Sequence, residues 1–161
     1  MNLEFKITCK GLVIMSVIND ESLSLKLFVI LSRAIQSITK RIEEDIKSYG
    51  LNPTEFAVLE LLYSKGDQPI QKIGDKILLA SSSITYVVDK LEKKRFLIRK
   101  PCPKDRRVTY ASITSEGIEL MDIIFPQHKE AIQQIFGGLD YTEKKMIIEK
   151  LKKLGYYALE L

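Results

Sequence analysis

The sequence predicts a mostly α-helical protein that carries one β-hairpin. Apolar residues recur every three or four positions in several long stretches, which is the period of an amphipathic helix. Only the stretch from Leu97 to Thr114 offers two short strand-like segments around a turn. The chain has 161 residues and is 45% hydrophobic, which suits one domain of ordinary size with its own core.

The first long helix is predicted in residues 20–50. Its apolar residues form a single stripe, and Gly50 suits the position just past a helix C-terminus. The stripe consists of Leu27, Leu31, Ala34, Ile35, Ile38, Ile42, Ile46 and Tyr49. A long helix of this kind near the end of a small protein needs a partner that covers its apolar stripe.

Residues 1–19 form an N-terminal extension with two interpretations. The apolar run from Gly11 to Ile18 is too short to span a bilayer, and the segment lacks the pattern of a secretory signal peptide. Either the extension packs beside the long helix, or the natural start is Met15 and residues 1–14 lie upstream of it, and we favour the second interpretation. We expect no membrane segment.

Two shorter helices follow the first. Asn52 can cap the second helix, with Pro53 at its first position and Glu55 where a capping box requires an acid. This helix is apolar on most sides, which predicts that it is buried. The third helix opens at Pro69. Its inward residues are Ile70, Ile73 and Ile77.

A fourth helix is predicted within residues 81–96. Its apolar residues Ile84, Val87, Val88 and Leu91 form one stripe of helical period. Serines at its start can cap free N–H groups, and such groups also bind phosphate. The polar candidates for reading DNA are Ser81, Ser82, Ser83, Thr85, Tyr86 and Lys90. Taken alone, an ordinary amphipathic helix with a solvated face explains this pattern equally well.

Basic residues concentrate just after this helix. The stretch from Lys93 to Arg107 holds eight basic residues and one acidic residue, while the whole chain has a net charge of only +4. Such a concentration is typical of a surface that binds a polyanion. The hairpin would present these charges at its tip, which Pro101 and Pro103 stiffen. The candidates for DNA contact here are Arg99, Lys104, Asp105, Arg106 and Arg107.

Helix, turn, helix, strand, basic loop and strand form the outline of a winged helix-turn-helix, which lays its second helix in the DNA major groove. The stretch DKLEKKRFLIRKPCPKDRRVTYASITSEG resembles the MarR family of bacterial regulators. The matching residues are Val88, Asp89 and Leu91 of the helix, Asp105, Arg106 and Arg107 of the wing, and Thr114 and Gly117 after it. The resemblance extends from about Leu23 to the C-terminus.

The chain departs from the family pattern at three places. Family members often carry Gly in the turn that Leu78, Leu79 and Ala80 occupy here, and Gly where Arg95 stands. They often carry Arg where Tyr86 stands, so we predict no operator sequence.

Two helices are predicted in the C-terminal segment, residues 114–161. Thr114 caps the first of them, Pro126 should kink it, and Gly137 and Gly138 end it. These helices and the first one hold more apolar surface than one small lobe can bury, so we expect a C2 homodimer. We therefore divide the chain into the extension 1–19, a dimerisation helix 20–50, a DNA-binding lobe 51–113 and C-terminal dimerisation helices 114–161.

The resemblance implies a repressor that binds a pseudo-palindromic site on double-stranded DNA. A small aromatic or phenolic effector, or oxidation of a cysteine, would release it. In the family, the wing aspartate helps to orient its arginines, a role that falls to Asp105. The candidate pocket residues are Tyr49, Phe56, Tyr63 and Phe125, for which core packing is the favoured alternative.

Several further residues bear on function. Cys102 is the candidate redox sensor because neighbouring basic residues favour a thiolate, although it can equally be a small exposed residue. His128 is expected to be a surface histidine and not a metal ligand. The sequence shows no catalytic dyad and no cofactor motif, so we predict a protein that is not an enzyme. Its two cysteines, Cys9 and Cys102, are far apart and suggest no disulfide framework, so we expect a cytoplasmic protein. A winged helix that binds proteins instead of DNA is the alternative.

Overall fold

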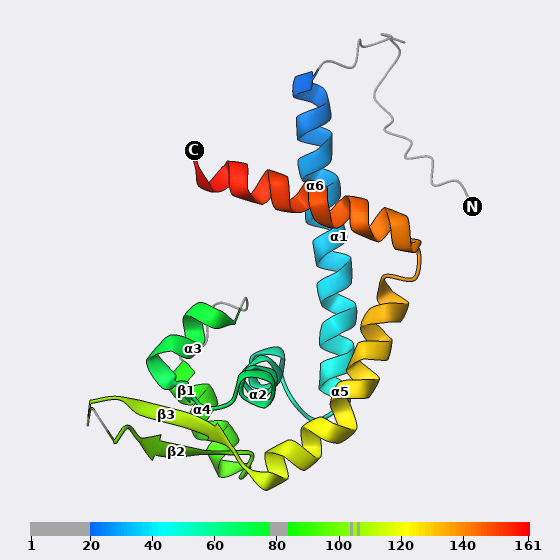
Figure 1. The fold of residues 1–161 in the computed structure, drawn as a ribbon. Helices are drawn as coiled ribbons and strands as arrows, with labels where there is room; N and C mark the ends of the chain where they lie inside the picture. The colour runs from blue at the N-terminus through cyan, green and yellow to red at the C-terminus, as the bar shows by residue number, and fades with distance from the viewer. Residues whose placement is uncertain (1–19, 78–83, 104, 106) are drawn as a thin grey trace. The chain divides into compact units, whose positions relative to one another are not determined.

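The computed structural model describes residues 20–77, 84–103, 105 and 107–161. The chain divides into two units, residues 1–36 and 37–161, with the boundary inside the first helix. The described helices are α1 (Asp20–Ser48), α2 (Pro53–Lys65), α3 (Ile70–Lys76), α4 (Ile84–Lys93), α5 (Ser115–Ile135) and α6 (Tyr141–Leu159). The strands are β1 (Gln68–Pro69), β2 (Leu97–Pro101) and β3 (Thr109–Ile113). The mostly α-helical fold with a wing is confirmed (Figure 1).

The predicted hairpin is present, with one addition. Strands β2 and β3 pair in antiparallel fashion, with Leu97 opposite Ile113 and Pro101 opposite Thr109. The short strand β1, which the sequence analysis missed, pairs with the other edge of β3 and makes the sheet order β1-β3-β2. Two residues, one of them proline, carry no alternation of polar and apolar side chains, which is why no pattern revealed β1.

The core lies where α2, α4, the sheet and the start of α5 meet. Its buried members include Leu59 of α2, Val88 of α4, Leu97 of β2 and Met121 of α5. Asn52 caps α2, and its side chain accepts a hydrogen bond from the Glu55 N–H, as the capping box predicted. The expectation that α2 is the buried central helix agrees with this core.

The start of α5 is fixed against the end of α4. The Thr114 hydroxyl accepts from the Gly117 N–H at 3.0 Å and donates to the Arg95 carbonyl at 2.6 Å. A Cβ at Gly117 would overlap the Phe96 carbonyl oxygen and come within 2.7 Å of Ile113. The Thr-x-x-Gly sequence is therefore required by this close approach between the helix and the chain before β2.

Helix α5 continues through Pro126 to Ile135 as one element, and Figure 1 shows its axis bending along its length. The proline therefore does not end the helix. Helix α6 begins at a second capping box, in which the Asp140 side chain accepts from the Glu143 N–H at 2.8 Å. No residue of α6 is buried in this single chain.

Candidate nucleic-acid interface

Helix α4 has one buried face and one open face, as its stripe predicted. Val87, Val88 and Leu91 are buried, whereas Thr85 and Tyr86 are exposed, Tyr86 by 59% of its surface. Lys90 lies on the border, with Nζ 5.7 Å from the centre of the Tyr86 ring. The predicted contacts Ser81, Ser82 and Ser83 lie outside the described residues. The open face thus offers a hydroxyl, a phenol and an ammonium group.

The end of α4 explains one departure from the family pattern. Arg95 has a φ of 64°, in the left-handed region that favours glycine. The Phe96 N–H bonds to the Leu91 carbonyl and the Arg95 N–H bonds to the Glu92 carbonyl, which together form a Schellman motif. Where the resemblance predicts glycine, an arginine therefore adopts a backbone conformation that glycine adopts without strain.

Arg99 connects α4 to the wing. Its guanidinium bonds to Asp89 at 2.5 Å and to Glu92, both of them on α4. Its backbone N–H also donates to Glu92, at 3.2 Å. Arg99 was predicted to contact DNA, but its guanidinium is bound to two carboxylates of its own chain, which gives it a clear role in holding β2 against α4.

Glu55 of α2 lies under α4 with only 2% of its surface exposed. Its carboxylate is 3.1 Å from Lys94 Nζ and 3.3 Å from Lys90 Nζ, and it accepts from the Asn52 N–H at 3.0 Å. Burial alone would raise the pKa of Glu55, but the hydrogen bonds from Asn52 and Lys94, with the nearby Lys90 ammonium group, lower it below the usual value. The sequence identified Glu55 only as a capping residue.

The wing tip shows the expected aspartate–arginine contact. Asp105 accepts from the Arg107 N–H at 3.0 Å and from its guanidinium at 3.2 and 3.3 Å. The Arg107 side chain is 90% exposed all the same. The bonds from Arg107 also lower the pKa of Asp105. Lys104 and Arg106 lie outside the described residues. One arginine is therefore held in a fixed direction at an open hairpin tip.

The basic stretch is less positive in three dimensions than along the sequence. Carboxylates from outside the stretch lie against it: Glu55 against Lys94, Asp89 and Glu92 against Arg99, and Asp67 3.5 Å from Lys100. Much of the positive charge of this stretch is therefore offset by carboxylates that the fold brings against it.

A model of the MarR family matches residues 51–109, which coincide with this lobe. The chain is also 60% identical over 135 residues to the HTH-type transcriptional regulator MhqR of Bacillus subtilis (strain 168), covering 84% of this chain and 93% of MhqR. The chain belongs to the MarR family. The family predicted from the wing and the Thr-x-x-Gly sequence is thereby confirmed, and so is the prediction of a DNA-binding transcriptional regulator that is not an enzyme.

Solved structures of other MarR-like proteins share the fold. AbsC of Streptomyces coelicolor has a TM-score of 0.76 at 18% identity, covering 89% of this chain and 97% of AbsC. Sco3205 of the same organism, solved in complex with DNA, has a TM-score of 0.72 at 20% identity, covering 85% of this chain and 90% of Sco3205.

The four aromatic residues suggested as an effector pocket pack in this MarR-family chain as core residues do. Phe56 is buried, and the Tyr63 ring lies edge-on to Phe125 with 5.8 Å between centroids. The Tyr63 and Tyr49 hydroxyls donate to Asp122 and Asp45, at 2.5 and 2.7 Å. These contacts favour the alternative of simple core packing.

His128 is a correction to the sequence analysis. We expected a surface histidine, but its side chain is only 13% exposed, and its ring lies 4.5 Å from Phe56, centroid to centroid. Nδ1 is 2.6 Å from the Asp45 carboxylate on α1. The partner is 83 residues away in the sequence, so local context gave no sign of it.

Cys102 lies in the wing of this MarR-family chain and is partly exposed. Its N–H donates to the Val108 carbonyl at 2.9 Å, which closes the hairpin. It lines a hollow of about 460 Å³ with Asp67, Lys100, Pro101, Pro103 and Tyr110. The Cys102 side chain is therefore accessible to solvent, and Lys100 lines the same hollow.

Proposed function

We propose that this chain is a MarR-type repressor that binds a pseudo-palindromic operator as a homodimer. The observation that carries the proposal is the wing tip, where Asp105 holds the exposed Arg107 in place. The wing tip belongs to the same DNA-binding lobe as the open face of α4, which carries Thr85 and Tyr86. A transcriptional regulator that is 60% identical and a DNA complex of the same fold support this proposal.

In the proposed complex, the wing tip and the open face of α4 contact different parts of the DNA. Arg106 and Arg107 enter the minor groove, where a narrow A·T tract attracts arginine. Thr85, Tyr86 and the serines before α4 meet base edges in the major groove, and Lys90 meets phosphate. The wing residues, with Lys90, therefore set the affinity for all sequences, whereas Thr85, Tyr86 and the serines set the sequence preference.

The wing assignment is tested by Arg106→Ala and Arg107→Ala, measured on a mixed-sequence duplex over a range of salt concentrations. Each variant should bind more weakly, with a salt slope smaller by about one. Lys65→Ala removes a positive charge at the exposed end of α2 and should leave the slope unchanged. Unchanged slopes in both arginine variants would contradict the assignment.

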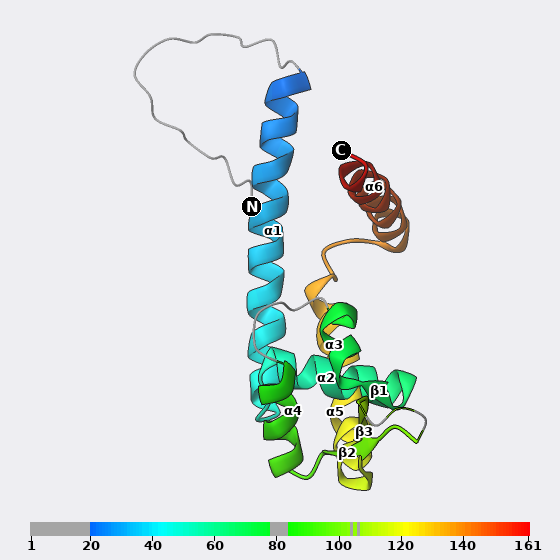
Figure 2. The same cartoon turned by 90° about the vertical axis from the view of Figure 1, so that its left-hand side faces the viewer.

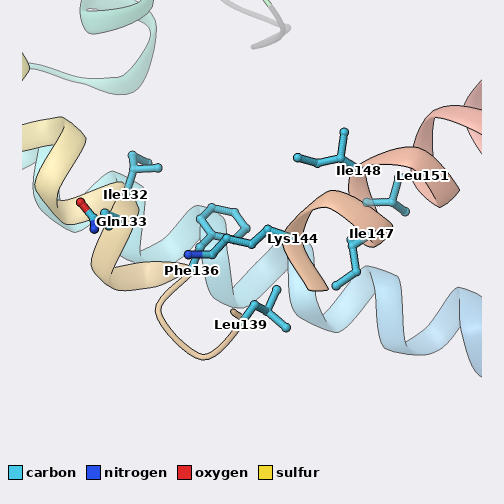
Figure 3. A pocket seen from close by; sticks show the side chains of 8 residues that line it. All are labelled: Ile132, Gln133, Phe136, Leu139, Lys144, Ile147, Ile148 and Leu151. Carbon is cyan, nitrogen blue, oxygen red and sulfur yellow. The ribbon is translucent and has the colours of Figure 1, made fainter. Parts of the chain in front are cut away.

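Unburied apolar surface supports the homodimer. Large apolar side chains stand exposed on α1, among them Leu25, Phe28 and Ile35, and on α6. An apolar pocket of about 410 Å³ lies between the end of α5 and α6 (Figure 3). Its lining is Ile132, Gln133, Phe136, Leu139, Lys144, Ile147, Ile148 and Leu151. A second copy that supplies apolar side chains covers such surfaces in a C2 dimer.

Helix α1 would also be long and apolar enough to cross a membrane, by length and composition alone, and a helix that packs against protein meets the same criterion. Lys26 and Arg33 stand in its apolar stretch, and charges at the centre of a span are costly. We therefore propose a second copy, and not a bilayer, as the cover for α1, with the dimer acting in the cytoplasm.

Two routes of release are proposed. A small aromatic or phenolic effector can drive release only if it binds the two arrangements of the lobes with different affinities. Alternatively, an electrophile reacts with the Cys102 thiol in a stress response. Cys102→Ser should then abolish release of DNA by quinones and oxidants, and an unchanged response would remove Cys102 from the proposal.

A second candidate is a winged-helix module that binds proteins. The ion pairs that offset much of the basic stretch are the observation that favours it. Weak binding to promoter DNA that does not depend on salt would favour this candidate.

A further inference from the structure

Glu55 is an unusual residue to find beneath a helix that contacts DNA. It is a nearly fully buried carboxylate, and an unpaired buried charge is costly. Capping α2 does not require this burial beneath α4, because a capping box forms equally well at a surface. The Asp140–Glu143 box of α6 shows this, since both of its residues are exposed.

Glu55 holds Lys90 of α4 and Lys94, which directly follows α4, unequally. Lys94 donates to Glu55 Oε2 at 3.1 Å and to the Gly50 carbonyl at 3.3 Å, so it is anchored at two points. Lys90 is 3.3 Å from Oε1, at ion-pair distance but without hydrogen-bond geometry, and Oε1 has no other partner. The Lys90 side chain is 41% exposed. Lys90 is therefore the looser of the two and can turn toward a phosphate.

We propose that Glu55 is a positioning residue for DNA binding, whose buried carboxylate anchors α4 through Lys94 and offsets the charge of Lys90. The inference rests on the proposed function, because Glu55 would act on the DNA-binding surface that this function requires. Glu55 lowers the attraction of α4 for any phosphate backbone, which carries no sequence information. Non-specific binding is thereby kept weak, while base contacts by Thr85 and Tyr86 are unaffected.

The test compares Glu55→Gln with the wild type on a mixed-sequence duplex of about three helical turns. Gln keeps an oxygen that can accept from the Asn52 N–H and removes the charge. Lys90 then neutralises one more phosphate, so the salt slope steepens by about 0.9 and the affinity rises several-fold. Glu60→Gln is the matched control, because it makes the same change of charge on α2 and no ion pair among the described residues involves Glu60.

A double variant shows whether Glu55→Gln acts by releasing the charge of Lys90 or by disturbing the fold of the lobe. In Glu55→Gln/Lys90→Gln the slope should return to the wild-type value, which a merely misfolded lobe would not do. In the wild-type background, Lys90→Gln should lower the slope by less than half of what Arg107→Gln does, and this comparison holds even if Glu55→Gln does not fold.

Each outcome has one meaning. If the wild type does not bind the duplex at low salt, the proposed function fails. If the wild type binds and Glu55→Gln has the same slope as Glu60→Gln, the inference about Glu55 is wrong. Equal losses of slope for Lys90→Gln and Arg107→Gln would also overturn it.

Discussion

The Asp45 carboxylate of α1 lies 2.6 Å from Nδ1 of His128 on α5. An ionised carboxylate only accepts hydrogen bonds, so Nδ1 carries the hydrogen. Asp45 also accepts from the Tyr49 hydroxyl at 2.7 Å, and the His128 ring packs on Phe56 of α2. One small polar cluster therefore joins the end of α1 and the middle of α5 to the core of the lobe.

Replacement of His128 by alanine should lower the free energy of unfolding by roughly 2 kcal/mol, because a ring contact and a mostly buried hydrogen bond are both lost. Urea unfolding at one fixed protein concentration measures this loss. Gln127→Ala, at an exposed neighbour on α5, should change it little. Equal midpoints for the two variants would contradict the structural role of His128.

Tyr49 should make stability fall at alkaline pH. Burial, with the hydrogen bond to Asp45 and the charge of that residue, raises the pKa of Tyr49 from 10.0 to about 12. Because the folded pKa is the higher one, this stabilisation is complete below pH 10 and is lost as the pH rises through 12. Thermal unfolding from pH 9 to 12 should show a shallower decline for Tyr49→Phe than for the wild type. Parallel declines would mean that the phenol does not contribute.

Arg95→Gly should stabilise the lobe by about 1 kcal/mol, because glycine adopts the left-handed conformation without strain. Arg95→Ala is the matched control, since it also removes the charged side chain but keeps the Cβ. Chemical unfolding of both variants measures the difference. If alanine and glycine stabilise equally, the backbone conformation is not the cause.

Gly117→Ala should destabilise the chain by roughly 2 kcal/mol, because the added Cβ forces α5 away from the Phe96 carbonyl. Gly138→Ala is the control, as a Cβ there meets nothing within 4 Å. The urea midpoints of the two variants should therefore differ clearly. Similar midpoints would show that the start of α5 has room to move.

The sequence predicted well those features that depend on local spacing. The stripe of α4, the Asn52 capping box and the hairpin from Leu97 to Ile113 all follow from residues close together in the chain. The family could be identified for the same reason, since the wing and the Thr-x-x-Gly sequence are contiguous.

Features that depend on distant partners were missed. Asp45 lies 83 residues from His128, and Glu55 lies 39 residues from Lys94, so no local pattern links them. Counting charge along the sequence likewise overstated the positive surface, because Arg99 is paired with Asp89 and Glu92 across the fold. The predicted contacts Ser81 to Ser83, Lys104 and Arg106 lie outside the described residues and remain predictions.

The central claim is that this chain binds a specific operator, and one binding measurement tests it most directly. The purified protein is titrated against a labelled fragment of its own upstream promoter at two salt concentrations, with excess non-specific DNA. We predict tight binding that weakens with salt and resists the competitor. Absence of binding at either salt concentration would contradict the claim and favour the protein-binding alternative.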